Sequence, residues 1–574
     1  MKVAVFGAGV GGLTTAHELV DRGFEVDVYD RLAVPGGKAR SVVLDRPGQE
    51  GLPGEHGFRF FPGFYRHVVE TMSRIPLPEG GHVADNLVDA TMGFFAHAGG
   101  PPLKAPSIGP RNLQQLIADI KNTAGFTTVL STADLEFFLG KVWQVLTSCD
   151  ERRLAEYELV SWVDFIDAPA RSEAYQLWFA GAMTRTLIAA SGDKASARTV
   201  GDIFVTLMLD GMRWGSASDR LLNGPTSEVW VKPWYDHLVS KGVRFHFGQH
   251  VTALHLDVPS GRLTGASVES PDGPVSVVAD HYVCALPVEV ASTLISSEIA
   301  DAAPSLAATR TLKDNVAWMS GIQIYLRHDV PIVNGHVMFA GSPWGLTAIS
   351  QNQFWQHRVE NDGDGSVKGV LSIDISDWAT KGSNGLSARE CDPETIKNEV
   401  LQQIRDCLPE LPPDQLAPEN IHSFFIDPDI VFFDEHGAAL ENHEPLFINE
   451  IGTHDVRPLA YTEIPNLFLA SDYVRTNTDL ATMEGANEAA RRAVNAILLR
   501  TGSSAPRCQL WEMRMPRTLA PLRWFDRRRF LKGLPWDERF PLLVRIASAI
   551  VHLVERITHL LPRRPNAGSR VARS

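Results

Sequence analysis

The sequence contains few cysteines, five in 574 residues, and their number is odd. None is spaced as Cys-x-x-Cys, which argues against a disulfide framework and against a zinc or iron–sulfur site. The 19 histidines show no ligand spacing either, because His246 and His250 are separated by the turn-forming Gly248. We therefore expect no metal centre, and we expect the cysteines to be buried as small apolar residues.

The chain also lacks any run of about 18 uncharged apolar residues, so no segment is expected to span a membrane. It lacks a basic N-terminal region followed by an apolar core, so a secretory signal is not expected and the cytoplasm is the expected compartment. There is no low-complexity tract and no internal repeat. The length allows about three or four domain-sized units.

Charge is distributed unevenly along the chain. The net charge is −14, but residues 501–574 hold 15 lysines and arginines against 5 acids, or +10, so residues 1–500 carry −24. Apolar residues between 543 and 561 fall on one helical face, and arginine, histidine and glutamate fall on the other. The segment 501–574 is therefore either an interfacial helix on an anionic membrane, at the inner face, or a helix docked on the protein body. No nucleic-acid partner is expected.

A glycine-rich turn at the N-terminus carries the strongest signal. The apolar strand 3–6 runs into Gly7, Gly9 and Gly12, and a helical pattern follows. A second strand ends on Asp30, 23 residues after Gly7. Such glycines permit a tight turn, close approach to a pyrophosphate and close helix–strand packing, and the acid accepts hydrogen bonds from a ribose. The pattern predicts dinucleotide binding, with the phosphates at a helix N-terminus.

Two further segments favour FAD over NAD. Gly36 and Gly37 offer a second close-approach backbone, and Lys38 and Arg40 place positive charge beside it. Asp472 ends a late apolar strand, where it can bind a ribityl hydroxyl, and a helix opening near Met483 can direct its N-terminus at a flavin. Two distant strand–helix units serving one long cofactor fit FAD better.

Alternating and helical patterns divide the rest of the chain. Helices are predicted over 135–146, 199–212, 229–240 and 483–499, paired strands over 250–256 and 263–268, and a second sheet over 315–355 and 368–376. We predict a nucleotide-binding domain from 1–75, 226–300 and 450–500. The inserts 76–225 and 301–449 are predicted to form one substrate-binding domain, and 501–574 a basic amphipathic extension.

Several motifs together resemble the FAD-dependent amine oxidase superfamily, and more narrowly its plant- and cyanobacterial-type phytoene and ζ-carotene desaturase branch. They are PGGK at 35–38, EHGFRFF at 55–61, VCALP at 283–287, NLFLASDY at 466–473 and MEGA at 483–486. Ser471 and Arg59 stand where this pattern usually has Gly and His. The resemblance implies an α/β fold, with a Rossmann-like FAD-binding domain interleaved with an α+β substrate-binding domain and a helical C-terminal extension.

The resemblance also implies roles for particular residues. The pyrophosphate would be held by Gly7, Gly9 and Gly12, with Gly37 and Lys38 along the phosphates and Asp30 on the adenosine ribose. Val251 would pair with adenine through its backbone, and Arg59 would lie beside the flavin. Asp472 and Met483 would lie at the ribityl–flavin end. The aromatic residues of 58–65 would wall a substrate channel or, for each one singly, pack in the core.

The favoured function is desaturation of a long apolar isoprenoid or carotenoid-like molecule by hydride transfer to flavin N5, with a quinone or O₂ as electron acceptor. No general base is evident, since the guanidinium of Arg59 stays protonated. The alternatives are a flavin amine oxidase for a hydrophobic amine, and a polyene or triterpene isomerase or dehydroxylase. A further alternative is a non-catalytic binder of prenyl or lipid groups. Only Tyr473 is aromatic in the segment before the last helix, which disfavours the amine oxidase.

Overall fold

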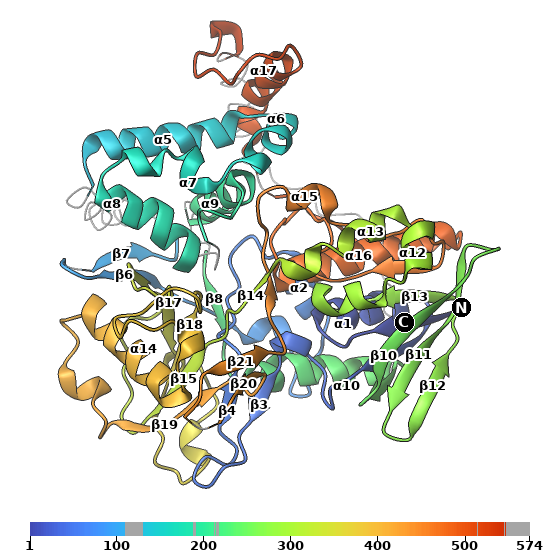
Figure 1. Ribbon diagram of the computed structural model, residues 1–574, viewed down its shortest axis with the longest axis horizontal. Coiled ribbons are helices and arrows are strands. Elements are labelled where there is room, and N and C mark those ends of the chain that lie inside the picture. The colour runs from blue at the N-terminus through green and yellow to red at the C-terminus, as the bar shows by residue number, and fades with distance from the viewer. Residues whose placement is uncertain are drawn as a thin grey trace, which may run out of the picture.

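The computed structural model describes residues 1–100, 102–109, 130–186, 191–211, 213, 217–434, 436–513, 515–544 and 546. Segments that are far apart in the sequence combine into two main sheets, and a separate layer of helices covers one of them (Figure 1). The structure therefore places side chains from several distant segments around common sites.

The first sheet is parallel and has the strand order β23-β13-β1-β2-β9. Its strands are β1 (Lys2–Phe6), β2 (Glu25–Asp30), β9 (Arg244–Phe247), β13 (His281–Cys284) and β23 (Leu467–Leu469). Strand β1 has β2 as its neighbour on one side and β13 on the other. The chain therefore leaves β1 in one direction and later returns to its other side, so the strand order reverses at β1. Ligands of open α/β sheets bind at such a switch point.

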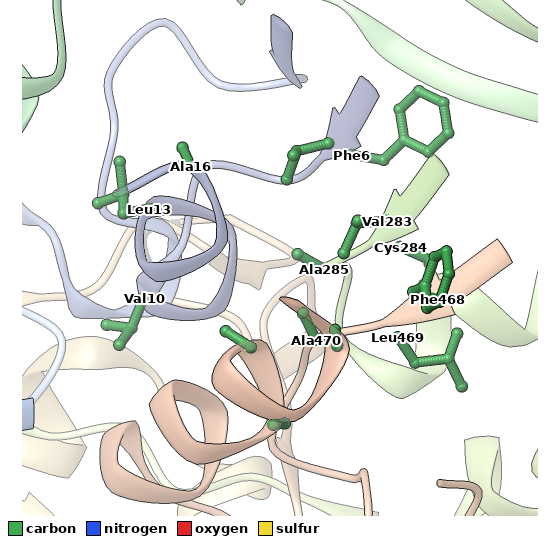
Figure 2. Packing of buried hydrophobic residues seen from close by; sticks show 14 of the residues in the cluster. Phe6, Val10, Leu13, Ala16, Val283, Cys284, Ala285, Phe468, Leu469 and Ala470 are labelled. Atoms are coloured by element: carbon green, nitrogen blue, oxygen red, sulfur yellow. The ribbon is translucent and has the colours of Figure 1, made fainter. Parts of the chain in front are cut away.

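Helices α1 (Val10–Val20), α10 (Lys232–Ser240) and α16 (Met483–Arg500) pack on this sheet. Figure 2 shows Val10, Leu13 and Ala16 of α1 near the end of the strand that carries Phe6, with Val283 and Phe468 on strands farther from the helix. The central strands β1, β13 and β23 are mostly apolar, as expected for a sheet covered by helices. The predicted Met483 helix is confirmed as α16.

A three-stranded antiparallel sheet lies beside the parallel one, with β10 (His250–Asp257), β11 (Arg262–Ser270) and β12 (Gly273–Val277). It confirms the predicted paired strands. The remaining short helices of this part of the chain are α2 (His67–Met72), α11 (Val288–Ala291), α12 (Ser297–Ala302), α13 (Pro304–Thr309) and α15 (Thr453–Val456). Two-stranded pairs are β3 (Ser41–Val43) with β4 (Pro53–Glu55), β5 (Leu87–Asp89) with β8 (Arg220–Leu222), β14 (Val316–Ala317) with β22 (Leu446–Phe447), and β20 (Ile430–Phe432) with β21 (Ala439–Asn442).

The second main sheet has seven strands in the order β19-β15-β18-β17-β16-β6-β7. They are β6 (Met92–His97), β7 (Leu103–Pro106), β15 (Ile322–Leu326), β16 (Val337–Ala340), β17 (Leu346–Ser350), β18 (Gly369–Ile375) and β19 (Ile421–Ile426). Helix α14 (Pro393–Cys407) buries its apolar face against the sheet. Both inserts contribute strands, since β6 and β7 come from 76–225; the division into domains itself stays a prediction.

The helical layer contains α5 (Thr132–Thr147), α6 (Asp150–Ala155), α7 (Trp162–Phe165), α8 (Glu173–Tyr175), a π-helix over Gln176–Thr186 and α9 (Ala197–Gly211). Phe138 stacks on Phe179 in its core, with ring centroids 3.7 Å apart. Helix α17 (Ala520–Phe530) docks on this layer through the buried pair Asp526–Arg152, at 3.0 Å. The predicted amphipathic helix over 543–561 lies almost wholly outside the described residues.

All five cysteines are buried and unbridged, which confirms their predicted burial. Within the described ranges no cluster of three or more potential ligands could hold a metal ion. No helix in the part of the chain that the structure describes is long and apolar enough to cross a membrane.

Candidate cofactor and substrate site

A cavity of about 590 Å³ opens at the carboxyl ends of β1, β2, β13 and β23. Two of these four strands, β13 and β23, lie far beyond the first 75 residues of the chain, so the sheet brings the cavity wall together from distant parts of the sequence. Every site residue predicted from the sequence lines this cavity except Gly12; the lining set comprises Gly7, Gly9, Asp30, Gly37, Lys38, Arg59, Val251, Asp472 and Met483.

Two glycine turns meet at one wall of the cavity. Gly7 has φ +105° and Gly37 has φ +53°, conformations that favour glycine. The Gly36 N–H donates to the Ala8 carbonyl at 2.9 Å, which ties the second turn to the first. A Cβ placed on Gly9 would have Gly37 Cα, at 3.8 Å, as its nearest neighbour, so its backbone faces open space. The two turns thus present bare backbone to the cavity.

Two further glycines allow α1 to pack closely against the Gly7 turn and the end of β23. A Cβ on Gly12 would lie 1.8 Å from the Gly7 carbonyl oxygen, and one on Gly11 would lie 1.9 Å from the Ala470 carbonyl oxygen. Gly12 therefore lets α1 pack directly against the Gly7 carbonyl. Gly11 was not among the predicted residues, and its requirement arises from a strand more than 450 residues away.

Asp30 holds the first turn in place. Its Oδ2 accepts from the Ala8 N–H at 2.6 Å and its Oδ1 from the Leu32 N–H at 2.8 Å. Burial raises the pKa of the carboxyl despite these two bonds. Each carboxylate oxygen can accept more than one hydrogen bond, so the side chain can still receive ribose hydroxyls.

The positive charge predicted beside the second glycine pair is already paired. The Lys38 ammonium lies 2.7 Å from Glu289 and also donates to the Pro445 carbonyl. Arg40 donates to both oxygens of Glu444, at 2.9 and 2.8 Å. Both side chains lie beside the glycine pair, and acids from distant segments pair with their charges. That Lys38 lies along the phosphates stays a prediction.

Asp472, just after β23, and the start of α16 line a further part of the cavity wall. Thr482 caps α16 by accepting from the Gly485 N–H at 3.2 Å. The helix has 18 residues, so its N-terminus carries partial positive charge toward the cavity at Met483. Glu484 in the first turn is turned away: it is buried and accepts from the Arg66 and His67 N–H groups.

Arg59 and Asp374 also line this cavity, and Asp374 was not among the residues predicted from the sequence. Arg59 donates to the Gly57 carbonyl at 2.9 Å and to the Lys38 carbonyl at 3.0 Å, and so joins two loops. Asp374 of β18 lines the same cavity, and burial raises its pKa to about 6. Its only signal in the sequence is an acid placed between Ile373 and Ile375 in an apolar strand.

A second cavity of about 210 Å³ adjoins the first. The two share six lining residues: Phe60, Tyr65, Met319, Leu446, Ala481 and Thr482. No Asp, Glu, Lys, Arg or His lines the second cavity among the described residues. Of the 58–65 aromatics, Phe58 lines the first cavity and Phe64 the second, whereas Phe61 packs in the core against Trp230. Some aromatic residues of this motif thus line a cavity and Phe61 packs in the core, while the substrate channel itself stays a prediction.

Buried polar atoms around the first cavity have no hydrogen-bond partner among the described residues. They include His56 Nε2, Arg59 Nε and Asp374 Oδ1. Together with the bare glycine backbone, they fit a large ligand that carries both phosphate and ring heteroatoms. The adjoining apolar cavity can then place a second, non-polar molecule against one end of that ligand.

Residues 10–498 match the family of flavin-containing amine oxidoreductases. The ζ-carotene desaturase of Synechocystis sp. is 23% identical over 531 residues, covering 87% of this chain and 97% of the relative. The 15-cis-phytoene desaturase of Synechococcus elongatus is 23% identical, covering 87% and 96%. Among solved structures, a putrescine oxidase variant gives a TM-score of 0.59 at 15% identity, covering 87% of this chain and 99% of that one. Cyclohexylamine oxidase from Brevibacterium oxydans gives 0.54 at 14%, covering 86% and 98%.

Proposed function

The chain belongs to the family of flavin-containing amine oxidoreductases, and on this premise we propose that it desaturates a long apolar isoprenoid of the carotenoid kind. The family and the FAD cofactor were both expected from the sequence motifs. The chain is thus an FAD-dependent oxidoreductase, and the open question is its substrate.

The cofactor position that we propose follows the cavity from end to end. The backbone at Gly7, Gly9 and Gly37 holds the pyrophosphate, with Gly12 closing the turn behind it. Asp30 holds the adenosine ribose, and the Val251 backbone holds adenine. Lys38 lies along the phosphates, and the far end, beside the flavin, is formed by Arg59, Asp472 and Met483. The support is that all of these except Gly12 line one cavity.

FAD supplies the chemistry by accepting a hydride. The chain's own residues position it and shape the field around it. The N-terminus of α16 directs partial positive charge at the end of the cavity where negative charge would develop. The wall shared by the two cavities, which includes Phe60 and Met319, keeps the reacting region dry.

One observation carries the choice of substrate: the cavity that adjoins the cofactor site is mostly apolar, and among the residues that the structure describes it has no carboxylate that could bind an ammonium group. A volume of about 210 Å³ holds the reacting segment of a polyene while the rest of the molecule extends beyond it. Full-length relatives named as ζ-carotene and phytoene desaturases support the same class.

The test is product analysis. The purified holoenzyme is incubated without oxygen with 15-cis-phytoene or ζ-carotene in liposomes and with a soluble benzoquinone, and new conjugated products are separated by their absorbance. We expect added double bonds in at least one substrate. The outcome that overturns the proposal is no turnover of either polyene, together with rapid peroxide release from putrescine or cyclohexylamine in air.

We also propose that the enzyme meets its substrate at an anionic membrane surface through the extension 501–574. Exposed apolar side chains there include Trp524, Leu531 and Leu542, and α17 carries three consecutive arginines in its last turn. Apolar side chains beside cations are what an anionic lipid surface binds. Co-flotation with liposomes that contain anionic lipid, but not with purely zwitterionic ones, is expected. A Leu531→Ser, Leu542→Ser variant should lose flotation, whereas Leu440→Ser, exposed on β21, should keep it.

A further inference from the structure

We propose that Asp374 is the proton acceptor of the desaturation, the group that removes the proton from one substrate carbon as the hydride leaves its neighbour. This inference rests on the proposed function. No such group is evident from the sequence, because Asp374 lies in none of the cofactor motifs and reaches the site only when β18 is placed beside β15 in the second sheet.

Asp374 lines the cofactor cavity and does not line the second one. A Cβ on Gly57 would be 2.6 Å from Asp374 Oδ1, and one on Gly321 would be 3.0 Å from it. The side chain is therefore inserted between the loop that carries Arg59 and the start of β15, at two positions that have no side chain of their own. Met319, two residues before Gly321, lines both cavities. Asp374 is thus near the wall where cofactor and substrate would meet.

The other acids that line the cavity each accept hydrogen bonds or form ion pairs, and Asp374 also receives one hydrogen bond, from the Phe58 backbone. Both oxygens of Asp30 accept backbone N–H groups, and Glu444 is bound by Arg40 and Arg31. Asp472 accepts from the Ser471 hydroxyl at 3.2 Å. Asp374 is, within the described ranges, the lining carboxylate that has a buried oxygen with no hydrogen-bond partner.

Groups from two segments oppose the effect of burial on Asp374. Burial raises its pKa, while Arg59, His56, the Phe58 backbone hydrogen bond and His336 lower it, and the result is a pKa of about 6. Arg59 and His56 come from the loop before Phe60, and His336 from the residue before β16. At neutral pH the carboxylate is charged and able to accept a proton, and its basicity lies near the working pH, where general bases are most effective.

The desaturation step removes one hydride and one proton from neighbouring substrate carbons. One substrate carbon loses its hydrogen with the electron pair, and that hydride passes to the flavin, the oxidant of this family. The neighbouring carbon loses its hydrogen as a proton, which binds to the Asp374 carboxylate. The electron pair of that second C–H bond becomes the new C=C bond. The substrate has then lost two hydrogens, and Asp374 returns its proton to water before the next turnover.

The first experiment measures flavin bleaching by a polyene that the wild type desaturates, in a single anaerobic turnover. We expect Asp374→Asn to react about 10²- to 10⁴-fold more slowly, the range for loss of a general base. Asp374→Glu should recover part of the rate, and formate should restore part of it to Asp374→Ala. Asp329→Asn is the matched control, because Asp329 lies after β15 of the same sheet, also has a pKa raised by burial, and does not line the cavity. It should react like the wild type.

The second experiment does not depend on turnover. Infrared spectra of the holoenzyme without substrate are recorded between pH 5 and 8. A carboxylic acid band should disappear with a midpoint near 6 and be missing from Asp374→Asn. An active wild type together with an unimpaired Asp374→Asn, or with no such band, overturns the role of Asp374 alone. A wild type that desaturates no polyene overturns the proposed function itself.

Discussion

Replacing Asp374 with Asn is expected to stabilise the protein at neutral pH while it impairs catalysis. The folded state raises the pKa of this carboxyl from 3.8 to about 6, because burial opposes the charge more than Arg59 favours it. Between these two values the folded state binds more protons than the unfolded state. The stability of the wild type therefore falls as pH rises through this window.

The magnitude follows from the shift. At about 1.4 kcal/mol per pKa unit, a charged Asp374 costs the folded protein up to about 3 kcal/mol above pH 7. Asn cannot ionise, so Asp374→Asn avoids this cost. For a chain of 574 residues, an unfolding entropy of about 2.1 cal/mol/K per residue converts 3 kcal/mol into a rise in Tm of about 2–3 °C.

The assay is differential scanning calorimetry of both proteins at saturating FAD, from pH 4 to pH 8. The Tm of Asp374→Asn should equal that of the wild type near pH 4 and exceed it by about 2–3 °C near pH 8. A difference that is constant with pH would contradict the reasoning, because it would show that the amide acts through packing and not through ionisation. A lower Tm at pH 8 would show that the charged carboxylate has a partner in the folded state.

Four further outcomes are expected. Gly9→Ala should weaken FAD binding at least tenfold, measured by flavin fluorescence, because its Cβ enters the cavity; the Tm should not change, because the Cβ meets no protein atom closer than 3.8 Å. Gly11→Ala should fail to fold stably, because its Cβ would lie 1.9 Å from the Ala470 carbonyl oxygen. Asp479→Asn should lower stability at pH 7 by about 3–5 kcal/mol, since Arg457 at 2.6 Å loses its buried partner, and the loss should shrink as pH falls because the folded pKa of Asp479 is lowered. Val200→Trp should keep the oxidised flavin spectrum and abolish polyene turnover by filling the second cavity, and retained turnover would refute the assignment of that cavity.

The sequence by itself determined the parts of this protein that depend on neighbours along the chain. The Gly7–Gly12 turn, the acid at the end of β2, the Asp472 strand end and the start of α16 are local patterns of strand, turn and helix, so their elements could be predicted and found in the structure. Motifs built in this way identify the cofactor class, because phosphate and ribose are bound by backbone and by strand-end acids.

Tertiary structure alone decided the contacts between segments that are hundreds of residues apart. It paired Lys38 with Glu289, made Gly11 indispensable through Ala470, and brought Asp374 into the lining of the cofactor cavity. None of these has a local pattern, because an ion pair, a backbone clash or an orphaned carboxylate exists only once both partners are placed in space. The chemistry of the site depends on such contacts, and for that reason the sequence motifs identified the flavin but not the residue that we propose removes the proton.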